Sequence, residues 1–161
     1  FVERPENHIS SSGLGTMGFG IPAAVGAQMA RRDDMVIAVS GDGSFMMNVQ
    51  ELGTIKRQKL PIKILLIDNQ RLGMVRQWQQ LFFEGRYSET ILTDNPDFVT
   101  LASAFDIPGE SIVVKEQITD ALTRLLDSDG PYLLHVSISE EENVWPLVPP
   151  GAANDNMMES L

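Results

Sequence analysis

Apolar residues cluster in short, largely uninterrupted runs along this chain, at residues 35–40, 62–67 and 132–138. Runs of this length without polar alternation are typical of strands that are buried on both faces of a parallel sheet. Residues 111–115 predict a fourth strand. The hydrophobic pattern therefore favours a sheet of parallel strands.

Segments with helical patterns lie before and between these runs, and the first of them is rich in Gly and Ala. They predict helices over residues 17–30, 45–58, 74–83, 96–105 and 117–126. Pro22 lies in the first turn of the first helix, Pro61 follows the end of the second, and Asn95 or Asp94 is expected to cap the fourth. The alternation predicts an α/β domain of three layers, with helices on both faces of a parallel sheet.

Composition narrows the class of protein without naming a function. The chain has 161 residues, of which 43% are hydrophobic, so it is large enough for one domain with a core. Its 12 basic and 22 acidic residues give a net charge of −10, which argues against nucleic acid as a partner. Without cysteine it has no disulfide framework, and a cytoplasmic location is compatible with that.

The sequence predicts no membrane span, and its first residues do not resemble a secretory signal. The apolar runs are shorter than the roughly 20 residues that a membrane span needs. The first residue is Phe1 rather than methionine, so we interpret the chain as a fragment of a longer protein. From Glu140 onward Pro, Gly and Asn become frequent, which predicts a domain over 1–139 and a tail over 140–161.

Candidate chemistry lies at the ends of two predicted strands. The first strand is followed by Gly41-Asp42-Gly43-Ser44, and the second by Asn69. The 25 residues between Gly43 and Asn69 are about what one helix and one strand of a βαβ unit require. Glycine permits close approach of a phosphate, and carboxylate and amide oxygens suit Mg²⁺. The pair predicts a diphosphate and metal site, although a lone Gly-Asp-Gly is more often a simple turn.

A second glycine motif allows an alternative reading. Residues 13–18 match G-x-G-x-x-G, and Asp42 lies beyond a strand as a dinucleotide-binding fold requires. The residues before these glycines, 6–12, are almost all polar instead of forming a hydrophobic strand. A non-catalytic dinucleotide-binding module is therefore the less favoured alternative.

Longer matched strings identify a family. Residues 41–53, 68–78 and 145–151 resemble the C-terminal thiamine diphosphate (ThDP) domain of acetohydroxyacid synthase (acetolactate synthase) catalytic subunits, closest to an enterobacterial isozyme. The similarity extends from Ser12 to about Pro150. It implies the ThDP-binding fold, here expected to lack an N-terminal strand. Other ThDP-dependent decarboxylases of 2-oxo acids, such as benzoylformate or pyruvate decarboxylases, remain an alternative because they share the metal motif.

The resemblance assigns roles residue by residue. It implies that Asp42, Asn69 and the backbone carbonyl of Arg71 bind the metal. The Gly15 carbonyl and the Met17 backbone and side chain would hold the aminopyrimidine ring and the bent shape of the cofactor. The remaining implied cofactor contacts are Gly41, Gly43, Ser44, Leu72, Gly73 and Met74. Met74 and Trp78 would line the substrate pocket.

The resemblance also implies an activity and partners. The family joins pyruvate to a second 2-oxo acid, pyruvate or 2-oxobutanoate, in branched-chain amino-acid biosynthesis. It uses ThDP and Mg²⁺, carries FAD mostly in other domains, forms dimers or tetramers, and has a small regulatory subunit. The activating glutamate belongs to an N-terminal domain absent here, so no catalytic residue is expected in this chain. Glu51 cannot replace that glutamate, and His8 and His135 are interpreted as structural.

Overall fold

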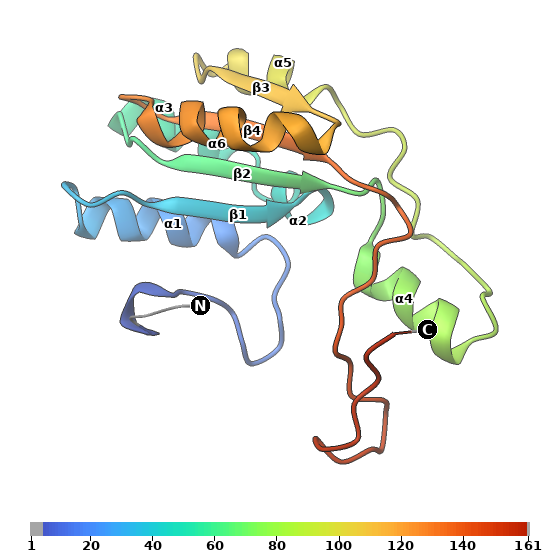
Figure 1. Cartoon of the computed structure of the whole chain (residues 1–161). Helices are drawn as coiled ribbons and strands as arrows, with labels where there is room; N and C mark the ends of the chain where they lie inside the picture. The colour runs from blue at the N-terminus through green and yellow to red at the C-terminus, as the bar shows by residue number, and fades with distance from the viewer. Residues whose placement is uncertain (1–4, 161) are drawn as a thin grey trace.

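Four parallel strands form the centre of the computed structural model, which describes residues 5–160 (Figure 1). They are β1 (Ile37–Gly41), β2 (Lys63–Asp68), β3 (Gly109–Ile112) and β4 (Tyr132–Ser137), arranged in the order β1-β2-β4-β3. In the β1–β2 register Gly41 lies opposite Ile67. The next residues along the two strands, Asp42 and Asp68, therefore lie side by side at this edge of the sheet.

Helices cover both faces of this sheet, as predicted. The helical elements are η1 (Pro5–Asn7), α1 (Gly20–Ala30), α2 (Asp42–Met46), α3 (Glu51–Gln58), α4 (Gly73–Phe82), α5 (Phe98–Ser103), η2 (Lys115–Gln117) and α6 (Ile118–Asp127). One core cluster joins α1, α2, α3 and α5 to the sheet, and a second joins α6 to β3 and β4. No helix within residues 5–160 is long and apolar enough to cross a membrane.

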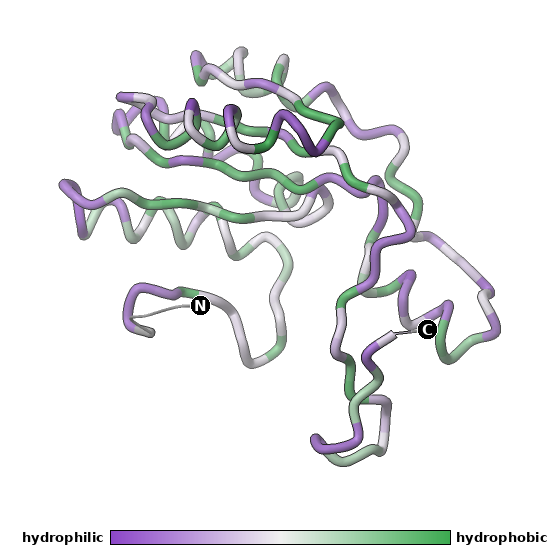
Figure 2. The backbone as a smooth tube through the Cα atoms, in the orientation of Figure 1, coloured by the Kyte–Doolittle hydropathy of each residue, from purple (hydrophilic) through white to green (hydrophobic). Residues whose placement is uncertain are grey.

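Alternation along the strands separates the two cores. Ile64 and Leu66 of β2 face the larger cluster, whereas Leu65 packs against the cluster beneath α6. Figure 2 shows the middle of β1 and of β2 as hydrophobic. Lys63, at the start of β2, is a buried charged residue, and its ammonium group donates to the Ser128 carbonyl, to Ser128 Oγ at 2.6 Å and to the Gly130 carbonyl at 2.7 Å. This lysine fastens the turn between α6 and β4.

Several predicted boundaries are wrong. The single helix expected at 45–58 is two helices, because the chain turns at 47–50, where the Asn48 side chain donates to the Gly18 carbonyl at 2.8 Å. Helix α2 begins at Asp42, so Ser44 lies inside its first turn and Gly41 is the N-cap. The strand expected at 111–115 begins earlier and ends earlier, as β3 (Gly109–Ile112), because Gly109 already pairs with Leu133 of β4.

The cap of α5 also differs from the prediction. The carboxylate of Asp97 accepts hydrogen bonds from the backbone N–H groups of Val99 and Thr100, both at 2.9 Å. An acceptor at this position satisfies N–H groups that have no partner within the helix. Neither Asn95 nor Asp94 caps the helix, and the Asn95 side chain is directed elsewhere. The first helix likewise begins at Gly20 rather than at residue 17.

Helix α4 and the C-terminal segment lie beside each other, away from the sheet (Figure 1). The Gln77 side chain is 1% exposed and bonds both backbone groups of Val144, at 2.9 and 3.0 Å. Asn143 donates to Gln80 at 3.0 Å. The segment predicted as a tail is thus fastened to α4, and within residues 138–160 it contains no named helix or strand.

Candidate functional site

A cavity of about 290 Å³ opens where β1 and β2 end. This is the edge at which parallel sheets bind ligands. All the predicted site residues except Gly15 and Trp78 line it, namely Met17, Gly41, Asp42, Gly43, Ser44, Asn69, Arg71, Leu72, Gly73 and Met74. The structure therefore brings together segments that lie far apart in the sequence.

Asp42 is the first residue of α2 and is only 2% exposed. The pKa of its carboxyl group is raised to about 6, chiefly by burial and also by the neighbouring Asp68, against the opposing effect of hydrogen bonds from Asn95 and the Gly43 backbone. Within residues 5–160 no lysine or arginine forms an ion pair with Asp42. The site thus presents a buried carboxylate that lacks a compensating cation.

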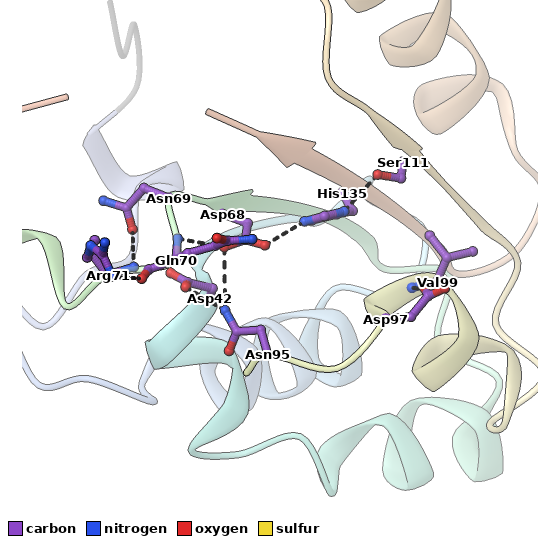
Figure 3. Close-up of polar contacts among 10 residues, drawn as sticks. All are labelled: Asp42, Asp68, Asn69, Gln70, Arg71, Asn95, Asp97, Val99, Ser111 and His135. Carbon is purple, nitrogen blue, oxygen red and sulfur yellow. Dashed lines mark hydrogen bonds and ion pairs between the residues drawn. The ribbon is translucent and has the colours of Figure 1, made fainter. Parts of the chain in front are cut away.

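Asp68, at the end of β2, is held from several directions (Figure 3). Its Oδ2 lies 2.9 Å from His135 Nε2, and its Oδ1 accepts from the Gln70 backbone N–H at 2.8 Å. His135 Nδ1 in turn lies 2.8 Å from Ser111 Oγ. His135 does not line the cavity, so it acts on this site through Asp68.

The loop from Asn69 to Gly73 carries the second predicted metal ligand. Asn69 Oδ1 accepts from the Arg71 backbone N–H at 3.1 Å, while Gln70 has a φ of 55°. A Cβ at Gly73 would lie 2.8 Å from Asn69 Nδ2, so glycine permits this arrangement. Arg71 lines the cavity, and its guanidinium forms an ion pair with Glu140.

The loop before α1 closes another side of the cavity. The Gly18 backbone N–H donates to Ser44 Oγ at 2.8 Å, so this hydroxyl secures the loop in addition to lining the cavity. A Cβ at Gly43 would lie 3.3 Å from the Met17 terminal methyl carbon, which shows how closely this side chain approaches the turn. Gly15 has a φ of 63° and lies outside the cavity lining.

Helix α4 begins at the cavity. Met74 lines it and is 48% exposed, and Trp78, one turn later, is 38% exposed and packs edge-on against Phe82 at 5.2 Å between ring centroids. Trp78 does not reach the cavity itself. His8 lies in a different groove, between the N-terminal segment, α1 and β1.

Sequence reasoning misses two asparagines that shape the site. Asn48 ties the glycine loop to the turn after α2, and Asn95 donates to Asp42 Oδ2 at 2.8 Å. The sequence favours a helix cap at Asn95, because an Asx residue before a helix usually has that role. Asp97, two residues later in the sequence, is also a good capping residue, and it could have indicated that Asn95 is free for another role.

The donor set fits a hard cation coordinated by oxygen. Within residues 5–160 no three His, Cys, Asp or Glu side chains gather as a metal cluster. Asp42, the Asn69 amide and the Arg71 carbonyl would instead supply one charge and three oxygens, which suits Mg²⁺ when phosphate oxygens complete the shell. The buried Asp42 carboxylate, which has no lysine or arginine partner among the described residues, is consistent with a bound Mg²⁺.

The glycine motif at 13–18 lacks the context of a dinucleotide site. Within the described residues it follows residues 8–10, which are not a strand, and α1 begins only at Gly20. The strand-turn-helix arrangement that such a motif needs is therefore not seen there.

Comparisons with known proteins agree with the geometry. The chain is 73% identical over 158 residues to the acetolactate synthase isozyme 2 large subunit of Escherichia coli, and 49% identical over 156 residues to the acetolactate synthase large subunit of Pyropia yezoensis. These matches cover 98% and 96% of the chain but only 29% and 26% of the relatives.

A solved structure shares the fold. The thiamine diphosphate-dependent 4-hydroxybenzoylformate decarboxylase of Rhodococcus jostii RHA1 superposes with a TM-score of 0.70 and 32% identity, over 79% of this chain and 24% of that one. The sequence profile described as "Thiamine pyrophosphate enzyme, C-terminal TPP binding domain" matches residues 1–136. The chain therefore belongs to the thiamine pyrophosphate enzyme family, as a C-terminal TPP-binding domain.

Proposed function

We propose that this chain is the ThDP-binding part of an acetolactate synthase catalytic subunit. That enzyme would join pyruvate to a second 2-oxo acid, pyruvate or 2-oxobutanoate, and release CO₂. The support is the 73% identity to a large subunit of that name and the cavity formed by the predicted residues. Because the chain spans less than a third of that relative, the activity belongs to the longer protein.

The observation that carries the proposal is the convergence of Asp42, Asn69 and Arg71 on one cavity. In the proposed complex Asp42, the Asn69 amide oxygen and the Arg71 carbonyl would hold Mg²⁺. The metal would link these residues to the diphosphate. Bound Mg²⁺ would give the buried Asp42 carboxylate a cation partner, which no lysine or arginine within residues 5–160 supplies.

The ends of the site would bind the rest of the cofactor. Backbone N–H groups in the first turn of α4 have no partner within the helix and favour the diphosphate. Met17 would support the bend between the two rings, and Gly43 allows this close approach. ThDP, when bound, supplies the nucleophilic carbon and the electron sink for decarboxylation. The chain's own residues would bind and orient it.

Other parts of the longer protein would complete the enzyme. We propose that an N-terminal domain supplies the activating glutamate and that other domains hold FAD. The described residues include no carboxylate other than Asp42 in the cavity lining. The relatives are named large subunits, which supports a smaller regulatory partner. Assembly as a dimer or tetramer, a cytoplasmic location and the division into 1–139 and 140–161 remain predictions.

A decarboxylase without carboligation is the second candidate. It is favoured by the structural similarity to the 4-hydroxybenzoylformate decarboxylase. Product analysis of the full-length protein with pyruvate distinguishes the two, since acetolactate supports the first and acetaldehyde alone supports the second.

The metal assignment is tested with Asp42→Ala in the full-length protein. We expect loss of acetolactate formation and of Mg²⁺-dependent ThDP binding, measured by calorimetry, because the variant lacks the only carboxylate ligand. The exposed Asp33→Ala is the matched control and should behave like the parent. Unchanged ThDP affinity and activity in Asp42→Ala would refute the assignment.

A further inference from the structure

The side-chain amide of Asn95 lies between two buried carboxylates. Asn95 precedes α5 and belongs to the loop that returns from α4 to the sheet. We propose that Asn95 is a positioning residue, whose amide fixes the orientation of the Asp42 carboxylate for the metal. The inference rests on the proposed function, and it adds a residue that the family resemblance did not assign.

The distances place one donor group against both acids. Asn95 Nδ2 lies 2.8 Å from Asp42 Oδ2 and 3.5 Å from Asp68 Oδ1 (Figure 3). A primary amide carries two N–H groups, so it can direct one toward each carboxylate. The shorter contact is a full hydrogen bond and the longer one lies at the limit of such a bond. Asn95 therefore determines mainly the rotamer of Asp42.

Asp68 provides the fixed reference for this amide. His135 holds one of its oxygens at 2.9 Å and the Gln70 backbone N–H holds the other at 2.8 Å. Ser111 Oγ fixes the far nitrogen of His135 at 2.8 Å. Polar contacts thus run from β3 across β4 and β2 to α2. Rotation of the Asp68 side chain would break these two bonds, so they hold Asp68 in its position beside Asn95.

Asn95 is itself held in place by backbone contacts. Its N–H donates to the Leu92 carbonyl at 3.2 Å, and the Leu92 N–H donates to the Gln70 carbonyl at 2.9 Å. The loop that carries Asn95 is therefore joined to the loop that carries Asn69. Since Asp97 caps α5, the Asn95 side chain is available to reach Asp42.

The chemistry of asparagine suits this position. A lysine or arginine would form an ion pair with Asp42 and compete with the cation. An aspartate would bring a third carboxylate into the same space and could not donate when ionised. A neutral donor orients the carboxylate and leaves its charge for the metal. Such partners of metal ligands typically affect metal affinity 10- to 100-fold.

The test uses the full-length protein with Asn95→Ala and Asn95→Leu. Leucine keeps the branched shape of asparagine without the donor. We expect the Mg²⁺ concentration that half-saturates ThDP binding to rise about 10- to 100-fold in both variants, with recovery of ThDP affinity at high Mg²⁺. Calorimetry gives the affinities, and thermal melting reports the fold. Asp97→Ala is the matched control, since it weakens α5 without removing a contact to Asp42.

Each outcome decides the question. A Mg²⁺ requirement like the parent's in both variants, or an equal rise in Asp97→Ala, overturns the positioning role. A variant that fails to fold also overturns it, because the proposal gives this half-buried amide no part in folding. If the parent itself binds ThDP without Mg²⁺, the proposed metal site fails first, and with it the inference built on it.

Discussion

Replacing Asp42 by asparagine should stabilise the chain in the absence of metal. The substitution keeps the shape of the side chain and removes its charge. Because burial raises the Asp42 pKa, the folded chain holds the ionised form less well than the unfolded chain does. Asp42 therefore weakens the fold at neutral pH, and asparagine should relieve that effect.

The sign and size follow from the pKa. The value rises from 3.8 to about 6 on folding, so between these values the folded chain binds more protons than the unfolded chain. The contribution of Asp42 to stability is thus lost as pH rises through this window, and it is fully lost above it. At about 1.4 kcal/mol for each pKa unit, the loss amounts to as much as about 3 kcal/mol.

Urea unfolding of the 161-residue chain with a chelator present measures this effect. The difference in unfolding free energy between Asp42→Asn and the parent should grow by about 2 to 3 kcal/mol from pH 3.5 to pH 7.5. Comparing the two chains at each pH cancels the titration of groups that do not interact with Asp42. With Mg²⁺ and ThDP present the order should reverse, because only the parent keeps the carboxylate ligand. A difference that does not change with pH would refute the reasoning.

Three further variants test other parts of the structure. Lys63→Met should lower the unfolding free energy by roughly 2 to 4 kcal/mol in urea titrations, because oxygens in the turn before β4 lose a buried charged donor; a loss below about 1 kcal/mol would contradict this. Gly73→Ala should raise the Mg²⁺ needed for ThDP binding roughly tenfold with little change in melting temperature, since its methyl group displaces Asn69; unchanged calorimetry would show that Asn69 adapts. The resemblance implies that Trp78, which lies outside the cavity described above, contacts substrate in the full-length enzyme, so Trp78→Leu should there reduce the preference for 2-oxobutanoate over pyruvate by about 1 to 3 kcal/mol while turnover survives; competition assays with an unchanged product ratio would make this tryptophan structural.

The strands are predictable because their signal is local. The apolar runs in β1, β2 and β4 have the character of strands covered on both faces, and the structure confirms them. The helix expected at 45–58 fails because the Asn48 side chain bonds Gly18, 30 residues away, and no local pattern shows such a contact. Strand β3 is weakly apolar, and its boundaries are set by its pairing with β4. The sequence pattern therefore predicts the strand at 111–115, although it spans Gly109–Ile112.

The site is predictable to the extent that it follows from chain topology. Asp42 and Asn69 follow adjacent parallel strands, so their proximity is a consequence of the strand order. The resemblance adds Met17 and Arg71, which no spacing argument would select. Asn95 stays hidden because its partner Asp42 is 53 residues away and its local context is that of a helix cap. Residues that support ligands from distant loops are the part that single-sequence reasoning does not reach.

The attachment of α4 to the C-terminal segment has a consequence for the order in which the domain is built. The bonds between Gln77 and Val144 close a loop of 67 residues, and chain entropy must be lost before they form. During synthesis the four strands emerge before Val144 does, whereas the final docking of α4 has to wait. We therefore expect the loop that starts this helix, with Asn69 and Arg71, to be among the last parts to become ordered. A domain cut before Val144 would retain its sheet, but the buried Gln77 side chain of α4 would lose the backbone partner that holds this helix in place.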